Sequence, residues 1–252
     1  MHLRDRVILT TGGASGIGCA CVQAVLAESA RVLIVDRDPS GAEVASSFRQ
    51  QGYCVEFAQA DTTLETDIRR AVKQAKDRFS QLDAVIACAG ISGPVGSTAP
   101  DISTEDWDRV MAVNVKGNFL IAKHTLALLG ASEVGTLVFL ASDAALVAFE
   151  GTTPYSTSKG AVLMLAKSLS VDHARIRVNC LCPGIVDTPM SRADLGRPEG
   201  FAGTDLPIMS ASQIARHAVF LASPVSAPMN GTSLITDFGY VARSALPALD
   251  FK

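Results

Sequence analysis

The sequence lacks the features of several classes of protein. No block of basic residues occurs in its 252 residues, and the formal net charge is −3, which argues against a nucleic-acid partner. No apolar run approaches the roughly 18 residues that a membrane-spanning helix needs. The first residues, MHLRDRVILTTGG, place charges at positions 4–6 before a short apolar run, unlike a signal peptide. We therefore expect a soluble, cytoplasmic protein with no membrane partner.

The six cysteines follow no spacing typical of a metal site. Two Cys-x-Cys pairs occur, at 19 and 21 and at 180 and 182, but no Cys-x-x-Cys motif or histidine pair lies near them. We expect no bound metal and six buried, reduced thiols.

The composition and the apolar pattern predict an α/β fold. Hydrophobic residues make up 48% of the chain and charged residues 19%, which allows a large core. Short, mostly uniformly apolar runs alternate with helix-period segments, as in parallel sheets covered on both faces. No repeat or linker divides the chain, so we expect one domain over 1–252. The predicted strands are 7–11, 31–36, 54–60, 84–88, 136–141, 177–182 and 233–237, and the predicted helices lie near 16–28, 40–51, 64–79, 104–129, 154–173 and 211–222.

A glycine-rich turn, TGGASGIG at 11–18, follows the first predicted strand. Gly12 suits a tight turn, Gly16 has no Cβ to block a phosphate, and Gly18 allows close packing of the helix on the sheet. The helix N-terminus offers unpaired N–H groups to a pyrophosphate. The spacing is G-x-x-x-G-x-G rather than the commoner G-x-G-x-x-G, so the turn alone is weak evidence for a dinucleotide site.

Asp36 ends the second predicted strand, 18 residues after Gly18. A carboxylate at this place can accept hydrogen bonds from the adenosine ribose of a dinucleotide. An ordinary strand-end aspartate is the alternative. The glycine turn and the strand–helix–strand pattern around it favour the ribose role.

A tyrosine and a lysine lie four positions apart in TPYSTSKGAVLMLAKSL, residues 153–169. Pro154 suits a helix start, and the apolar residues that follow recur at helical spacing. Side chains at i and i+4 project from the same helix face, so Tyr155 and Lys159 would be held side by side. Alone, this spacing also fits a surface pair without function.

Several motifs occur together and in order along the chain. TGGASGIG, Asp61, CAG at 88–90, NVKGNF from Asn114, Ser142, YSTSK and PGIVDT from Pro183 resemble the motifs of the classical short-chain dehydrogenase/reductases. The resemblance runs from about residue 5 to 239. It implies a single-domain, Rossmann-like, doubly wound sheet of seven parallel strands, in an enzyme that transfers a hydride between a secondary alcohol or its ketone and NAD.

The resemblance also implies roles for four catalytic residues. Tyr155 would be the general acid/base, and Ser142 would bind the substrate oxygen. Lys159 would hold the nicotinamide ribose and, with the positive nicotinamide, lower the pKa of Tyr155 from its usual value of about 10. Asn114 helps to hold a water on the proton path to Lys159 in the family. The cofactor-binding residues implied are Gly12, Ser15, Gly16, Ile17, Gly18, Asp36, Asp61, Thr62, Ala89, Gly90, Tyr155, Lys159, Ile185 and Thr188.

Three features depart from the family pattern. Cys88 replaces the usual asparagine of N-A-G, and Phe238 interrupts the usual D-G-G at 237–239. The irregular segment 187–207 contains three glycines and three prolines; we interpret it as a rather short substrate lid. The long helices near 104–129 and 154–173 form the dimer interface in this family, so we expect a homo-oligomer, a dimer or commonly a tetramer.

Two other functions remain open from the sequence. An extended-type epimerase or dehydratase normally needs a substrate domain beyond the sheet. A non-catalytic dinucleotide sensor would have no reason to keep Tyr155 and Lys159 together. The segments that flank the pocket in the family, 144–150 and 185–190, are mainly apolar, which favours a modest apolar or aromatic alcohol with Glu150 as a polar contact. Polyols, sugars, cis-diols and hydroxysteroids remain open as substrates.

Overall fold

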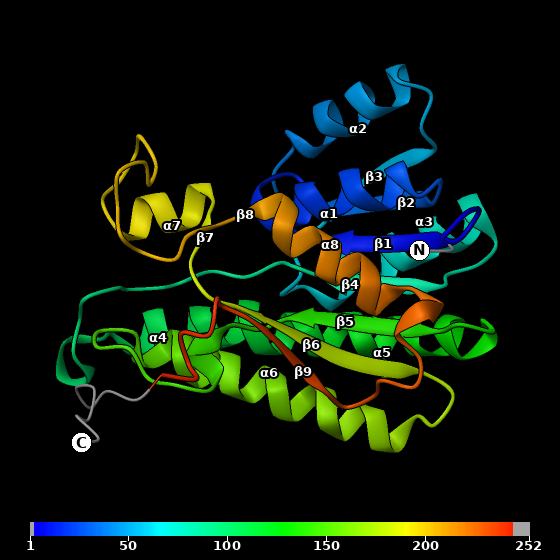
Figure 1. Cartoon of the computed structure of the whole chain (residues 1–252). Helices are drawn as coiled ribbons and strands as arrows, with labels where there is room; N and C mark the ends of the chain where they lie inside the picture. Colours follow the sequence, from blue (N-terminus) through cyan, green and yellow to red (C-terminus); the bar gives the residue numbers. More distant parts are fainter. Residues whose placement is uncertain (1–2, 244–252) are drawn as a thin grey trace, which may run out of the picture.

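The computed structural model describes residues 3–243, and its centre is a sheet of seven parallel strands (Figure 1). The strand order is β3-β2-β1-β4-β5-β6-β9, so the chain winds outward in both directions from β1 and β4. This order confirms the predicted doubly wound fold. The strands are β1 Val7–Thr11, β2 Arg31–Asp36, β3 Val55–Gln59, β4 Ala84–Ala87, β5 Thr136–Leu140, β6 Arg177–Pro183 and β9 Ser233–Thr236.

The central strands are buried because helices cover both faces of the sheet. Ile8 and Leu9, neighbours on β1, point to opposite faces and join separate apolar cores. Ile8 packs in the layer of α1, α2 and α8, and Leu9 in the layer of α3, α5 and α6. These helices are α1 Gly16–Ala27, α2 Gly41–Gln50, α3 Glu65–Phe79, α5 Gly117–Ala131, α6 Thr153–Asp172 and α8 Ala211–Ala222, and single turns of 3-10 helix lie at Ala99–Asp101, Asp143–Ala145 and Pro224–Ser226.

The single helix predicted near 104–129 is divided into three parts. α4 spans Thr104–Met111, a π-helical turn spans Ala112–Lys116, and α5 continues from Gly117. The backbone oxygen of Asn114, in the π-helical turn, accepts a hydrogen bond of 2.6 Å from the amide Nδ2 of Asn118. Apolar spacing does not distinguish such a turn from a continuous α-helix, because the wider turn shifts the pattern by only one residue.

The segment predicted as an irregular lid contains regular structure. β7 at Val186–Asp187 pairs in parallel with β8 at Met209–Ser210, and α7 spans Pro189–Asp194 between them. The Thr188 side chain caps α7 by accepting a hydrogen bond from the backbone N–H of Ser191. After β8, Ser210 and Gln213 form the capping box that the sequence SASQ indicates at the start of α8.

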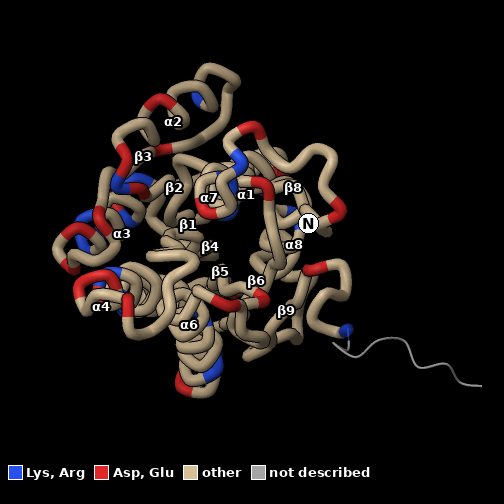
Figure 2. Tube along the Cα trace, turned by 90° about the vertical axis from the view of Figure 1, so that its left-hand side faces the viewer, with Lys and Arg blue, Asp and Glu red and all other residues tan. Residues whose placement is uncertain are grey.

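Surface charge is mixed in sign. Lys, Arg, Asp and Glu are interspersed along α3 in Figure 2, where Arg70 and Lys73 form ion pairs with Asp67 and Asp77. No helix among residues 3–243 is both long and apolar enough to cross a bilayer. The cysteines all carry free thiols, but the expectation that all are buried was wrong, since Cys54 is exposed and only Cys21, Cys180 and Cys182 are fully buried.

Candidate functional site

The glycine turn between β1 and α1 is tightly packed against the end of β4. Gly12 has a φ of +65°, and a Cβ there would lie 2.9 Å from the backbone of Ala89. A Cβ at Gly18 would lie 2.0 Å from the backbone oxygen of Gly12. Any side chain at Gly18 would therefore displace the turn, which explains the glycine.

The start of α1 is open to a ligand. The N-cap residue Ser15 makes no side-chain capping bond, so the first N–H groups of the helix are left for another acceptor. Gly16 has a φ of +52° and lines a cavity. Uncapped N–H groups at a helix start, beside a backbone without side chains, fit the pyrophosphate of a dinucleotide.

Asp36 ties the end of β2 to the glycine turn. One carboxylate oxygen accepts a 3.0 Å hydrogen bond from the backbone N–H of Ala14, and the other accepts one of 3.0 Å from Asp38. These bonds fix the orientation of the carboxylate at the edge of the cavity and leave lone pairs for ribose hydroxyls. The residues present therefore fit the adenosine half of a dinucleotide.

Tyr155 and Lys159 lie on the first two turns of α6 and face the same cavity, as their spacing predicts. The ammonium of Lys159 is 5.5 Å from the centre of the Tyr155 ring and donates a 2.8 Å hydrogen bond to the backbone oxygen of Leu140. Lys159 is only 4% exposed, and burial lowers its pKa to about 8. The lysine is thus held beside the phenol, at the carboxyl end of β5.

The pKa of Tyr155 differs from the expectation for the complete site. Its pKa is raised to about 12, mainly by burial; a hydrogen bond with Ser142 acts in the opposite direction, and the nearby carboxylates of Asp143 and Asp194 add to the rise. Lys159 alone does not lower this pKa in the protein without cofactor. The lowered pKa of Tyr155 that we expected would therefore need the positive charge of a bound nicotinamide.

Ser142 is positioned directly after β5. Its hydroxyl accepts a 3.1 Å hydrogen bond from the backbone N–H of Ala144 and donates one of 2.9 Å to the carboxylate of Asp143. Asp143 is 6% exposed, and burial raises its pKa. These two bonds hold the Ser142 oxygen at the cavity wall, close to Tyr155.

Asn114 lies behind the cavity wall rather than on it. Its amide donates to the backbone oxygen of Ile91 at 2.8 Å and to the hydroxyl of Ser158 at 2.9 Å, and its side-chain oxygen accepts from the N–H of Ile91 at 2.9 Å. A Cβ on Gly90 would lie 3.3 Å from this oxygen and 3.5 Å from the Lys159 ammonium. Asn114 is therefore next to Lys159 but already bonded within the protein.

One cavity of about 700 Å³ connects these parts. It runs from Asp36 and the glycine turn to the Tyr155 and Lys159 pair, and it is lined by 15 of the residues expected from the sequence. Only Asn114 of the expected residues does not line it. The 15 are Gly12, Ser15, Gly16, Ile17, Gly18, Asp36, Asp61, Thr62, Ala89, Gly90, Ser142, Tyr155, Lys159, Ile185 and Thr188.

Comparison with known families gives the same interpretation. The family described as short chain dehydrogenase matches residues 6–197, more than half of the chain. The chain belongs to this family.

Relatives in the family include enzymes of secondary alcohols. The chain is 37% identical to 2-(R)-hydroxypropyl-CoM dehydrogenase of Xanthobacter autotrophicus, over 94% of this chain and 99% of the relative. It is 31% identical to a cyclopentanol dehydrogenase of Comamonas testosteroni, over 96% of this chain and 99% of the relative. The protein is thus an oxidoreductase of the short-chain dehydrogenase family.

Solved structures of the family contain either nicotinamide cofactor. A 3-ketoacyl-(acyl-carrier-protein) reductase from Brucella melitensis complexed with NADH is 30% identical, with a TM-score of 0.86 over 94% of this chain and 98% of that chain. ElxO with NADP bound is 25% identical, with a TM-score of 0.85 over 95% of this chain and 100% of that chain. The family therefore uses a nicotinamide dinucleotide.

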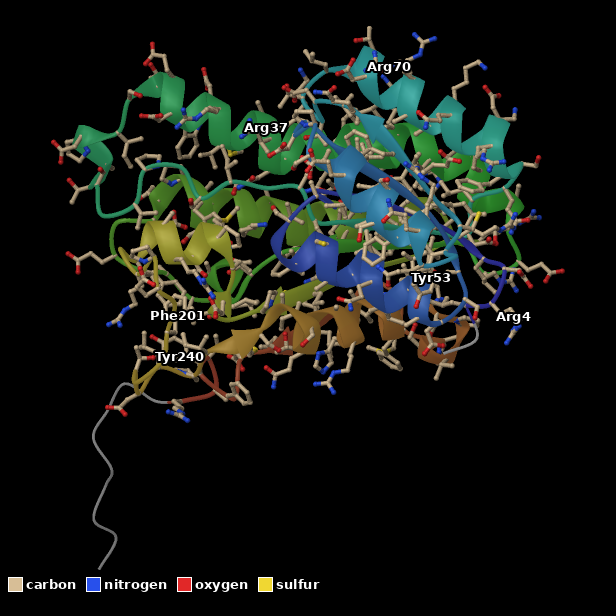
Figure 3. All side chains as sticks on the ribbon, turned by 90° about the horizontal axis from the view of Figure 1, so that it is seen from above. Arg4, Arg37, Tyr53, Arg70, Phe201 and Tyr240 are labelled. Atoms are coloured by element: carbon tan, nitrogen blue, oxygen red, sulfur yellow. The ribbon has the colours of Figure 1, made fainter. Side chains whose placement is uncertain are left out.

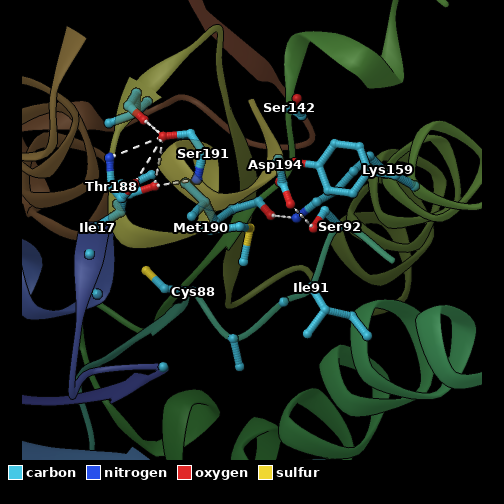
Figure 4. A pocket seen from close by; sticks show the side chains of 18 of the residues that line it. Ile17, Cys88, Ile91, Ser92, Ser142, Lys159, Thr188, Met190, Ser191 and Asp194 are labelled. Atoms are coloured by element: carbon cyan, nitrogen blue, oxygen red, sulfur yellow. Dashed lines mark hydrogen bonds between the residues drawn. The ribbon is translucent and has the colours of Figure 1, made fainter. Parts of the chain in front are cut away.

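Within this short-chain dehydrogenase, Cys88 and Phe238 stand at the two departures from the family pattern. Cys88 lines the cavity (Figure 4). Its hydrogen bond with the buried thiol of Cys21 raises the pKa of Cys21. Phe238 is 60% exposed and has a φ of +53°, a conformation that favours glycine. Cys88 thus contacts α1 from the cofactor side of the cavity, whereas Phe238 lies on the surface.

Sequence reasoning missed part of the cavity wall near Tyr155. Asp194 and Ser92 line it and are hydrogen-bonded to each other (Figure 4). Phe149, from the segment 144–150 that we expected to flank the pocket, also lines it and stacks on Tyr240, with ring centres 5.9 Å apart. Tyr240 and Phe201 are at the same end of the molecule in Figure 3. Asp194 belongs to the segment interpreted as a lid, but nothing in the sequence singled it out.

Proposed function

We propose that this protein is an NAD-dependent dehydrogenase that oxidises a secondary alcohol or reduces the corresponding ketone. The observation that carries the proposal is the single cavity with Asp36 at one end and the pair of Tyr155 and Lys159 with Ser142 at the other. The secondary-alcohol dehydrogenases among its relatives support the substrate class.

The glycine turn and Asp36 would hold the adenosine and pyrophosphate half of NAD, and Lys159 the nicotinamide ribose. Asp61, Thr62, Ala89 and Gly90 would contact the adenosine side, and Ile185 and Thr188 the carboxamide. When bound, NAD accepts a hydride from the alcohol carbon, or NADH returns one to the ketone. The protein's own contribution is to place the substrate oxygen and move its proton.

Tyr155 and Ser142 would hold the substrate oxygen together. In alcohol oxidation the phenolate of Tyr155 accepts the hydroxyl proton, and in ketone reduction the phenol donates it. The Ser142 hydroxyl donates a hydrogen bond to Asp143 in the structure. We propose that this hydroxyl turns toward the substrate oxygen when substrate binds. Asn114 would support the proton path through its place beside Lys159.

We propose that the segment 187–207 closes over the substrate and that the protein forms a homo-oligomer in the cytoplasm. Phe119 on α5 and Met164 and Val171 on α6 are exposed apolar side chains, with Val171 at 82% exposure. They lie on the two helices that pair subunits in this family. Burial in a subunit interface would remove this apolar surface from water.

The experiment is incubation with NAD and a panel of secondary alcohols, with nicotinamide absorbance as the readout. Tyr155→Phe keeps the ring and removes the transferable proton, so we expect turnover to fall by at least ~10²-fold while NAD affinity is retained. Tyr53→Phe removes a phenol hydroxyl outside the cavity and is the matched control. Turnover of Tyr155→Phe within about tenfold of wild type would exclude the proposed role. NAD binding without turnover of any alcohol or ketone would favour the dinucleotide sensor.

A further inference from the structure

The cavity wall beside Tyr155 contains a polar pair with unused hydrogen-bonding capacity. The Ser92 hydroxyl donates a 2.8 Å hydrogen bond to one carboxylate oxygen of Asp194, and both residues are half-buried (Figure 4). Within residues 3–243, the Asp194 carboxylate has no other hydrogen bond and no ion pair. Its second oxygen is therefore free to accept a hydrogen bond from a ligand.

The position of Asp194 relates it to the reacting end of the cavity. Its negative charge contributes to the raised pKa of Tyr155, so the carboxylate is within electrostatic reach of the phenol. It is the last residue of α7, a helix whose residues line this cavity. A substrate whose oxygen meets Tyr155 would extend toward Asp194 and Ser92.

The charges of this region are one-sided. Three acidic residues, Asp143, Glu150 and Asp194, line this end of the cavity. Among the residues that the structure describes, Lys159 is the one basic residue that lines the same end. The Lys159 ammonium is directed to the backbone oxygen of Leu140. Arg192, on the same short helix as Asp194, is paired with Asp187 through bonds of 2.6 and 3.0 Å. Among residues 3–243, no basic side chain at this end of the cavity is therefore left unpaired and placed to bind an anionic substrate.

The rest of the wall is apolar. Val95, Phe149, Met190 and Leu195 line the same cavity, so a carboxylate in this setting is poorly hydrated once substrate enters. A hydrogen-bond donor on the substrate would satisfy it. An apolar substrate would leave the second oxygen of the carboxylate unpaired, and an anionic substrate would be repelled.

We propose that Asp194, positioned by Ser92, selects secondary alcohols that carry a second hydrogen-bond donor, a hydroxyl or an ammonium group, and rejects anionic ones. This proposal rests on the proposed function and specifies its substrate class. It also revises the preference for a modest apolar or aromatic alcohol with Glu150 as a polar contact, since the apolar residues form only part of the wall.

The test uses four matched ligands that share the same secondary alcohol. They are 2-pentanol, 1,4-pentanediol, 5-amino-2-pentanol and 4-hydroxypentanoate, which place a methyl, hydroxyl, ammonium or carboxylate group at the same end. Calorimetry of each ligand with the NAD-loaded full-length protein gives Kd, and nicotinamide absorbance gives kcat/KM. For the wild type we expect the diol and the amino alcohol to bind at least tenfold more tightly than 2-pentanol, and 4-hydroxypentanoate to bind at least tenfold more weakly.

Asp194→Asn removes the charge and keeps the shape of the side chain. We expect it to reduce the preference for the amino alcohol over 4-hydroxypentanoate by at least tenfold, and Ser92→Ala to reduce it by less. Asp205→Asn is the control, because it makes the same change of net charge at an exposed carboxylate outside the cavity lining.

Binding and turnover separate the two proposals. If the wild type binds the four ligands with different Kd values and Asp194→Asn removes these differences, the inference is supported. This holds even if no ligand is turned over and the proposed function fails. Equal Kd values for all four ligands overturn the inference, whether or not 2-pentanol is oxidised. The inference is also overturned if Asp194→Asn shows the same differences in Kd among the four ligands as the wild type.

Discussion

The ammonium of Lys159 donates a 2.8 Å hydrogen bond to the backbone oxygen of Leu140, the last residue of β5. This bond fixes a cation between α6 and the carboxyl end of the sheet, where the cofactor cavity lies. Lys159 is 4% exposed, and one carbonyl oxygen replaces only part of the water that its charge loses. The placement that we propose for catalysis should therefore reduce the stability of the folded protein.

We predict that Lys159→Met stabilises the cofactor-free protein at pH 7 while removing activity. Burial lowers the pKa of Lys159 from 10.5 to about 8, so below pH 8 the folded state holds a charge that the unfolded state accommodates better. That cost is about 3 kcal/mol at pH 7, and it disappears as the pH rises from about 8 toward 10.5. Loss of the bond to Leu140 offsets about 1 kcal/mol.

Denaturant unfolding of both proteins between pH 7 and 10 measures this effect. The variant should be more stable by about 1–2 kcal/mol at pH 7, and its advantage should shrink or reverse by pH 10. Lys167→Met, at an exposed position on the same helix, should show no such pH dependence. A difference between Lys159→Met and the wild type that is constant across this pH range would contradict the prediction.

The glycine turn gives a second prediction, on stability and cofactor affinity together. In Gly18→Ala the new Cβ would meet the backbone oxygen of Gly12 at 2.0 Å, so the turn must move. We expect a loss of about 1–3 kcal/mol of stability and at least a tenfold weaker Kd for NAD. Gly130→Ala is the control, because its Cβ would meet only Ile176 at 3.8 Å, within a helix that favours alanine. NAD affinity of Gly18→Ala equal to the wild type would argue against a phosphate site at this turn.

The segment 187–207 is predicted to gain protection when ligands bind. Beyond α7 the stretch 195–207 has no helix or strand, and it adjoins the cavity wall at Leu195. Hydrogen exchange with and without NAD and substrate should show slower exchange across 195–207 in the complex, with little change in the turn 132–135. Equal protection of 195–207 in both states would show that this segment is not a lid.

The sequence predicted the sheet well because buried parallel strands are uniformly apolar. β1 and β2 have the predicted bounds, and the other five strands of the central sheet differ by one or two residues. Helical spacing likewise placed Tyr155 beside Lys159. These features depend on residues close together in the chain, so local patterns are sufficient to find them.

What the sequence did not show depends on contacts between distant segments. The pairing of β7 with β8 spans more than 20 residues and involves only two residues in each strand. Ser92 and Asp194 are 102 positions apart, and each is an unremarkable polar residue in its own segment. The raised pKa of Tyr155 comes from burial in the folded cavity, which no local motif records.

Cofactor choice is the last prediction. The Asp36 carboxylate is held at the cavity edge by the N–H groups of Ala14 and Asp38, so a 2′-phosphate on the ribose would meet a fixed negative charge. Arg37 lines the same cavity and is the one basic residue near this end of the described lining. It lies one residue beyond the end of β2 and is exposed, so water screens its charge, whereas two backbone N–H groups hold the Asp36 carboxylate in place. We therefore expect the repulsion to dominate.

The wild type should use NAD with a kcat/KM at least ~10²-fold above that for NADP, which corresponds to about 2.7 kcal/mol. Asp36→Ala should reduce this ratio mainly by improving NADP, because the charge is removed while the glycine turn remains. It should also lose about 1 kcal/mol of stability with the bond to Ala14. Asp38→Ala, which removes an exposed carboxylate two residues further on, is the control and should keep the preference. Equal use of NAD and NADP by the wild type would show either that Asp36 does not face the ribose or that Arg37 compensates for its charge.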